Sequence, residues 1–147
     1  MNPRLSYLEE SVRGASPVRL VTLLYEQAIE DLRRALAAHA CGDIERRTHE
    51  IDHAMLVLGH LQATLDKQQG GQVAANLELF YEQIRSGLVQ AQCRQSPAEL
   101  ELQISRLRQV RDAWCEVDRS NVQPAIASES APSPAEREQR PAADWNA

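Results

Sequence analysis

Four long segments with helical periodicity, separated by short turn signals, constrain the fold of this chain more than any other feature. Ser16-Pro17 is typical of a helix start, because a capping serine precedes a proline at the first helical position. Gly42 can adopt the left-handed conformation that ends this helix, and Asp43 can cap the next one. We therefore expect helices over about 17–40 and about 44–67.

Two further turn signals delimit the second half of the chain. Gly70-Gly71 interrupts the periodic pattern. Ser96-Pro97-Ala98-Glu99 combines a capping serine, a first-position proline and a glutamate that can complete a capping box. We expect helices over about 72–94 and over about 97–119.

Each segment places its apolar side chains on one face at about 100° per residue. The four stripes are Val21, Leu24, Ala28, Leu32 and Ala35; Ile44, Thr48, Ile51, Met55, Leu58 and Leu65; Val73, Leu77, Phe80, Ile84, Leu88 and Ala91; and Leu100, Ile104, Leu107 and Trp114. An aromatic content of 4% argues against a sheet. Because short turns favour antiparallel neighbours, the sequence predicts an all-α fold, an antiparallel up-down four-helix bundle over 16–119.

Segments of different character flank the predicted bundle. Leu5, Leu8 and Val12 have near-helical spacing, so we expect residues 1–15 to form a short N-terminal arm that folds back on the bundle. Residues 120–147 are rich in Ala, Ser, Pro and Glu, and their prolines predict a disordered C-terminal tail. Trp145 in this tail is either a docking residue or has no specific role.

Composition excludes several classes of function. A net charge of -5 is the wrong sign for a protein that grips nucleic acid. The apolar runs are far shorter than the roughly 20 residues of a membrane span. The first residues lack a secretory signal, which predicts a cytoplasmic location. The three cysteines form no Cys-x-x-Cys pair, which argues against a disulfide framework and against a zinc cage.

One motif suggests catalysis. His49, Glu50 and His53 match the zinc-protease pattern, with two ligands one turn apart and a glutamate to activate water. Helical geometry, however, places both histidines opposite the stripe of Ile51, where they face water. His60 does not have the spacing of a third ligand. We keep a small zinc hydrolase as an alternative, but expect no enzyme activity, no metal and no cofactor.

Several apolar residues lie outside the predicted core stripes. On the second helix, Leu56 and Val57 fall off the expected buried face and Leu61 lies at its flank. The others are Leu20, Leu23, Leu79, Val89 and Leu102. Helices that are apolar on more than one side are expected where another amphipathic helix binds. This pattern favours a helix-binding module over an enzyme.

An ordered series of short matches extends through most of the chain. It comprises Tyr7, Ser16-Pro17, Leu23-Leu24-Tyr25-Glu26-Gln27-Ala28-Ile29, Leu65-Asp66, Gly70-Gly71, Ala75-Asn76-Leu77, Leu79-Phe80-Tyr81, Leu107-Arg108 and Ala113-Trp114. In this order and spacing, the region from Ser6 to Trp114 resembles the flagellin export chaperone family, FliS. It departs from the family at Glu26, where aspartate is frequent, and at Gly14-Ala15, where threonine and alanine are frequent.

The resemblance implies a cytoplasmic chaperone that binds the disordered C-terminal region of flagellin, prevents premature polymerisation and delivers it to the type III export gate. A regulatory bundle that binds an anti-sigma factor or another flagellar protein is the alternative. The resemblance also implies that the arm lies over part of the binding surface, so Tyr7 is either a gating contact or a simple aromatic staple. Helical geometry, and not a matched family motif, gives the expected partner contacts: Tyr7, Leu56, Val57, Leu61, Leu79 and Leu102.

Overall fold

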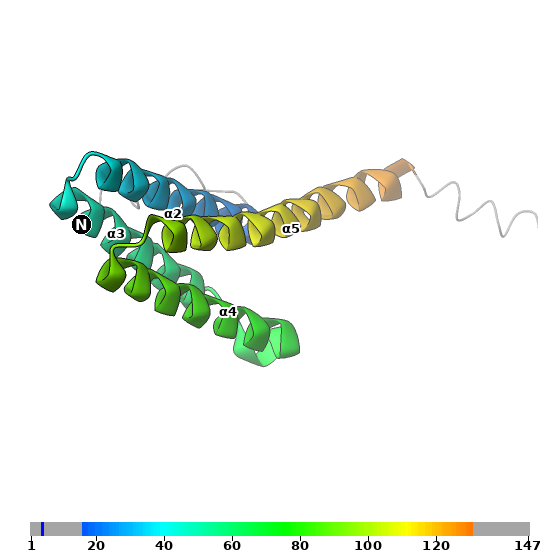
Figure 1. The fold of residues 1–147 in the computed structure, drawn as a ribbon. Helices are drawn as coiled ribbons and strands as arrows, with labels where there is room; N and C mark the ends of the chain where they lie inside the picture. The colour runs from blue at the N-terminus through cyan, green and yellow to red at the C-terminus, as the bar shows by residue number, and fades with distance from the viewer. Residues whose placement is uncertain (1–3, 5–15, 131–147) are drawn as a thin grey trace, which may run out of the picture.

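The computed structural model describes residue 4 and residues 16–130, with side chains described as far as residue 120. The helices are α2 (Pro17–Ala40), α3 (Ile44–Ala63), α4 (Lys67–Arg94) and α5 (Pro97–Ser130) (Figure 1). α2 packs along α3 and α5, and α4 packs against α5 and α3. Each helix therefore has two main neighbours, and the predicted up-down four-helix bundle is confirmed.

The starts of α2 and α3 follow the predicted capping chemistry. The Ser16 hydroxyl accepts the Arg19 backbone N–H at 3.1 Å. The Asp43 carboxylate accepts the Arg46 backbone N–H at 3.0 Å. Gly42 has a φ of 75°, a left-handed conformation that glycine adopts without strain. These contacts fix the tight turn that places α3 alongside α2.

The start of α5 keeps its capping serine but forms no capping box. The Ser96 hydroxyl accepts the Glu99 backbone N–H at 3.1 Å. The Ser96 N–H instead donates to the Ala91 carbonyl at 3.0 Å, because Gln95 is left-handed with a φ of 50° and closes α4. The Glu99 carboxylate accepts the Gln103 amide at 2.7 Å. The predicted capping box is therefore wrong, although the helix boundary is right.

The turn between α3 and α4 lies earlier than the double glycine indicated. α3 ends at Ala63, and the Asp66 carboxylate caps α4 by accepting the Gln69 backbone N–H at 3.0 Å. Gly71 lies inside α4 with φ 55° and ψ -133°, a non-helical conformation that separates the first turn from the rest of the helix. The glycine signal thus marks a kink within α4 and not its start.

α5 is longer than the sequence predicted. Its backbone continues beyond the expected boundary at residue 119 to Ser130, and in Figure 1 its C-terminal half extends past the other helices. Residues 1–3, 5–15 and 131–147, which include most of the expected arm and Trp145, lie outside the described residues.

The core consists mainly of the predicted stripes. Its large fully buried residues include Tyr25, Leu32, Leu58, Tyr81, Ile84, Leu88, Leu100 and Leu107. The predicted stripes of α3 and α4 are wrong at their first residues, because Ile44 is 53% exposed and Val73 is 64% exposed. On α3 the buried face also includes three polar residues, Arg47, Glu50 and His53. The buried face of α3 therefore includes positions that its apolar pattern assigned to water.

Candidate partner-binding site

Exposed leucines lie on three helices of the bundle. Leu56 of α3 is 46% exposed, Leu79 of α4 is 60% exposed and Leu102 of α5 is 42% exposed. The core is closed without these side chains, so their apolar area is available to another molecule. These three leucines are exposed, as the sequence predicted.

Two other predicted contacts are core residues. Val57 and Leu61 are completely buried and belong to the central cluster. Their predicted exposure is wrong, because the buried face of α3 is turned towards Glu50 and Ala54 and away from Ile44. Tyr7 lies outside the described residues.

An apolar recess lies between the start of α2, the turn that connects α3 to α4, and Trp114 of α5. It has a volume of about 180 Å³. Its lining is Val21, Thr64, Leu65, Asp66, Gly70, Val73, Ala74, Leu77, Tyr81 and Trp114. Gly70 of this lining directly precedes Gly71, the residue at which α4 kinks. The bundle therefore has a concave apolar surface at this recess in addition to the exposed leucines on its outer faces.

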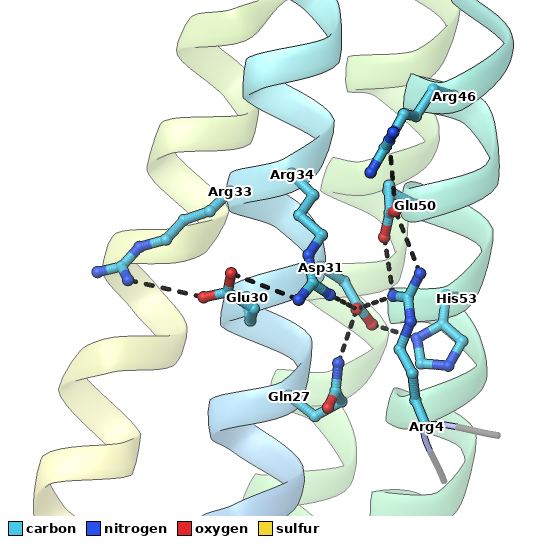
Figure 2. A network of polar contacts seen from close by, with 9 residues as sticks. All are labelled: Arg4, Gln27, Glu30, Asp31, Arg33, Arg34, Arg46, Glu50 and His53. Atoms are coloured by element: carbon cyan, nitrogen blue, oxygen red, sulfur yellow. Dashed lines mark hydrogen bonds and ion pairs between the residues drawn. The ribbon is translucent and has the colours of Figure 1, made fainter.

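A polar cluster lies between α2 and α3 (Figure 2). The Arg4 guanidinium donates from Nη1 to Asp31 Oδ1 at 2.5 Å and to Glu50 Oε1 at 2.8 Å. Its Nη2 donates to Glu50 Oε2 at 3.2 Å, which completes a bidentate contact. His53 Nδ1 pairs with the second oxygen of Asp31. A residue near the start of the chain thus joins two carboxylates on two helices.

The two carboxylates are buried whereas the arginine is partly open to solvent. The side chains of Asp31 and Glu50 are 0% and 2% exposed, and that of Arg4 is 29% exposed. Hydrogen bonding to Glu50 raises the pKa of Arg4 above its usual value. Burial disfavours the ionised form of Glu50, but the hydrogen bonds and positive charge of Arg4 outweigh burial and hold its pKa below the ordinary value. Glu50 is therefore an anion at neutral pH.

The zinc-protease motif has a different geometry from the one predicted. His49 is exposed as expected, but His53 is 5% exposed and its predicted orientation towards water is wrong. Glu50 is engaged by Arg4, and His53 is engaged by Asp31. Among residue 4 and residues 16–130, no group of three or more His, Cys, Asp and Glu side chains is arranged to hold a metal ion. Glu50 and His53 instead participate in the contact between α2 and α3.

The polar cluster was missed by sequence reasoning because its parts are far apart in the chain. The signal that could have found it is Asp31, an acidic residue directly before the core residue Leu32 of α2. A charge on a buried face requires a partner of opposite charge. Neither periodicity nor spacing identifies Arg4 as that partner.

A closed helical core with exposed leucines on three helices defines a helical-bundle protein that carries apolar side chains on its outer surface. The family model of FliS, described as flagellar protein FliS, matches residues 1–121. The chain therefore belongs to the FliS family, a family of flagellar secretion chaperones. No helix in the described part of the chain is long and apolar enough to cross a membrane.

Curated relatives cover most of the bundle. The chain is 31% identical over 107 residues to the flagellar secretion chaperone FliSB of Pseudomonas aeruginosa, which covers 73% of this chain and 85% of the relative. It is 29% identical over 111 residues to the flagellar secretion chaperone FliS of Salmonella typhimurium, covering 75% and 82% of the two chains. It is 27% identical over 110 residues to the flagellar secretion chaperone FliS of Vibrio cholerae, a match that covers 75% of this chain and 81% of the relative.

Proposed function

We propose that this protein binds the C-terminal segment of flagellin in the cytoplasm, keeps it from polymerising and delivers it to the flagellar export apparatus. It acts as a binding protein and not as an enzyme. The observation that carries the proposal is the set of exposed leucines Leu56, Leu79 and Leu102 on a bundle of the secretion-chaperone family. Of the predicted contacts that lie within the described residues, these are the ones whose side chains are accessible to a partner.

The distribution of the leucines suits a partner that is unfolded before it binds. A disordered segment must offset its ordering entropy by burying apolar surface, and it can wrap around several helices to do so. Leu56, Leu79 and Leu102 lie on α3, α4 and α5, so a partner that covers all of them contacts more than one side of the bundle. Fully burying one leucine contributes about 1.5–3 kcal/mol.

The experiment is a calorimetric titration of the full chain with the C-terminal segment of flagellin from the same organism, with circular dichroism before and after mixing. We expect saturable binding, a gain in helix and a negative heat-capacity change, which together indicate coupled folding on apolar surface. A folded chaperone that shows no binding contradicts the proposal.

The same titration with an anti-sigma factor tests the alternative partner, and with an isolated export-gate domain it tests delivery. Binding of the anti-sigma factor in the absence of flagellin binding replaces the proposed function with a regulatory one. Binding of the gate domain by the chaperone–flagellin complex, and not by flagellin alone, supports delivery.

A further inference from the structure

Arg85 of α4 lies against α3 and is held there by two features of that helix. Its Nε donates to Gln62 Oε1 at 3.0 Å, and the Gln62 amide donates in turn to Glu82 Oε2 at 2.9 Å. A Cβ atom built at Gly59 would lie 3.3 Å from Arg85 Nη2. Glycine is less favourable than alanine inside a helix, but here it leaves the space that the guanidinium occupies. Gln62 and Gly59 therefore give the guanidinium a defined orientation.

This oriented guanidinium has no counter-ion within the described part of the chain. Arg85 is only partly exposed, and none of the ion pairs formed by the described residues includes it. Glu82, three residues earlier on α4, directs its Oε2 to Gln62 instead. Nη1 and Nη2 of Arg85 have no hydrogen-bond partner among the described residues. A carboxylate can accept two parallel hydrogen bonds from such a pair of donors.

α3 and α4 run antiparallel, and two side-chain contacts define their register. Gln62 contacts Arg85 near the end of α3, and the Gln92 amide donates to Thr48 Oγ1 at 2.6 Å near its start. Residues of α3 between positions 48 and 62 therefore lie beside residues of α4 between positions 85 and 92.

Two exposed apolar side chains lie between these contacts, one on each helix. Leu56 of α3 is 46% exposed and Val89 of α4 is 50% exposed. Leu56 comes about one turn before Gly59, and Val89 comes about one turn after Arg85. In an antiparallel pair, both are displaced in the same direction from the guanidinium. The outer face of α3 and α4 thus combines an unpaired cation with aliphatic surface about one helical turn away.

The composition of this face is typical of the centre of a protein interface. Arginine is enriched among the residues that dominate binding energy, and aliphatic neighbours that exclude water strengthen its hydrogen bonds. A symmetric contact with a second copy would bring the two Arg85 guanidinium groups towards each other, which is unfavourable. The occupant that fits is a segment of another protein that carries a carboxylate and an aliphatic side chain about one turn apart.

We propose that Leu56, Arg85 and Val89 form one docking site, in which a carboxylate of the flagellin segment binds the Nη atoms of Arg85 and a neighbouring aliphatic side chain packs on Leu56 and Val89. Arg85 thereby selects an acidic position in a partner that the exposed leucines alone would select only by hydropathy. The identity of the partner rests on the proposed function, whereas the pairing of an acid with Arg85 is a separate claim about this face.

The first test is a calorimetric titration of full-length variants with the C-terminal segment of flagellin. Arg85→Gln should bind about tenfold more weakly than wild-type protein, and Arg85→Glu more weakly still. Arg94→Glu is the matched control, because Arg94 is an exposed residue on the opposite side of the same helix and the net charge changes equally. Wild-type affinity of Arg85→Gln, or equal losses in Arg85→Glu and Arg94→Glu, overturns the proposal.

The acid on the partner is located by replacing each Asp and Glu of the segment by lysine, one at a time. One replacement should weaken binding to wild-type protein about tenfold, and that segment should bind Arg85→Glu about tenfold more tightly than the unmodified segment does. Absence of such a position overturns the proposal. If Arg85→Glu does not fold, the series is measured on Arg85→Gln, where the effect of one replacement should be lost. An undiminished effect of every replacement then overturns the proposal.

A double-variant cycle tests whether the cation and the aliphatic surface belong to one site. The losses of affinity in Val89→Ala and Arg85→Gln should be non-additive, because both substitutions remove part of the same contact. Leu102→Ala is the control, since Leu102 is exposed on α5, and its effect should add to that of Arg85→Gln. Additive effects of Val89→Ala and Arg85→Gln contradict a single docking site.

Failure of this inference is distinguishable from failure of the proposed function. If wild-type protein and Arg94→Glu bind the segment and the Arg85 variants bind it equally well, the docking site is overturned and the proposed function stands. A folded wild-type protein that does not bind the segment contradicts the proposed function and the docking site together. Sedimentation equilibrium tests the remaining occupant: a wild-type dimer that Arg85→Glu dissociates would assign this face to a second copy and overturn the proposal.

Discussion

The hydroxyl of Tyr25 on α2 donates a hydrogen bond of 2.9 Å to the hydroxyl of Tyr81 on α4 in the middle of the core. The two ring centroids are 6.1 Å apart with an interplanar angle of 53°. Burial raises the pKa of both tyrosines, so both hydroxyls are neutral over the physiological range. This pair connects two helices that are not neighbours in the chain.

Replacing one member of this pair should destabilise the bundle. Tyr25→Phe leaves the buried Tyr81 hydroxyl without its donor, which costs about 1–3 kcal/mol. The double variant Tyr25→Phe/Tyr81→Phe should recover part of this loss, because neither buried hydroxyl of the pair then remains unpaired. Urea unfolding of the four proteins of this cycle measures the coupling. Additive losses would show that the hydroxyls do not depend on each other.

A second close contact lies between α4 and α5. A Cβ atom built at Gly87 would lie 2.1 Å from Gln103 Nε2 and 2.5 Å from its Cδ. Gln103 is completely buried, so it has no solvent-filled space into which it can move. We expect Gly87→Ala to destabilise the bundle by about 1–3 kcal/mol.

The matched test of this contact is a double variant. Gly87→Ala/Gln103→Ala provides room for the added methyl group and should lose less stability than the sum of the two single variants, as judged by thermal unfolding. A full additive loss would mean that the two residues do not compete for space.

The fold was predictable because it depends on local chemistry. Ser16, Asp43 and Ser96 cap their helices as the sequence indicated, and the apolar stripes of α2 and α5 are buried or partly buried. Residues a few positions apart determine these features, so the order of residues alone reveals them. The double glycine predicted the wrong start for α4. Asp66 caps the helix before the glycines, and Gly71 lies within the helix as a kink.

The candidate partner-binding surface was only partly predictable for a different reason. Arg47, Glu50 and His53 are buried, although a hydropathy pattern assigns such residues to water. The partners of these buried side chains are distant in the sequence; Glu50, for example, accepts a hydrogen bond from Arg4. The face of α3 was therefore misplaced, and Val57 and Leu61 were assigned to the surface. Leu79 and Leu102 were placed correctly because α4 and α5 bury fewer charged residues.

Acid should weaken the contact between Arg4 and Glu50. The pKa of Glu50 in the folded chain lies below its ordinary value, so its contribution is full above the unfolded pKa of about 4.3 and is lost as the pH falls through the folded pKa. The difference in unfolding free energy between wild-type protein and Glu50→Gln should therefore be largest at neutral pH and shrink below about pH 4.

Urea unfolding at a series of pH values measures this difference. The charged and titratable groups around Glu50 are Arg4, Asp31, Arg34, Arg46, His49 and His53. A Glu50→Gln effect that is the same at acidic and neutral pH would show that the ion pair does not contribute to this dependence.

Removing the side-chain cap of α5 should lower the stability of the bundle only modestly. Ser96→Ala removes the acceptor for the Glu99 backbone N–H and should cost about 1 kcal/mol. Ser96→Asp preserves an acceptor and should retain most of the stability, as measured by urea unfolding. Because Glu99 contacts Gln103 and not the Ser96 N–H, Glu99→Gln should not mimic the loss of the cap.

The adjacent residues Leu56 and Val57 should respond in opposite ways to the same substitution. Val57 is 0% exposed, so Val57→Asp introduces a buried charge that costs several kcal/mol and should abolish the cooperative thermal transition. Leu56 is 46% exposed, so Leu56→Asp should change stability by no more than about 0.5 kcal/mol.

The affinity for the flagellin segment should distinguish Leu56→Asp from its control variant. On the proposed function, Leu56→Asp loses apolar contact area and should weaken binding of the flagellin segment about tenfold or more. Gln109→Asp adds the same charge at an exposed position of α5 and should bind as wild-type protein does. If Leu56→Asp binds with wild-type affinity while its melting temperature is unchanged, the partner does not use this face of α3. If both variants weaken binding equally, the effect comes from net charge, and the assignment of Leu56 as a contact is wrong.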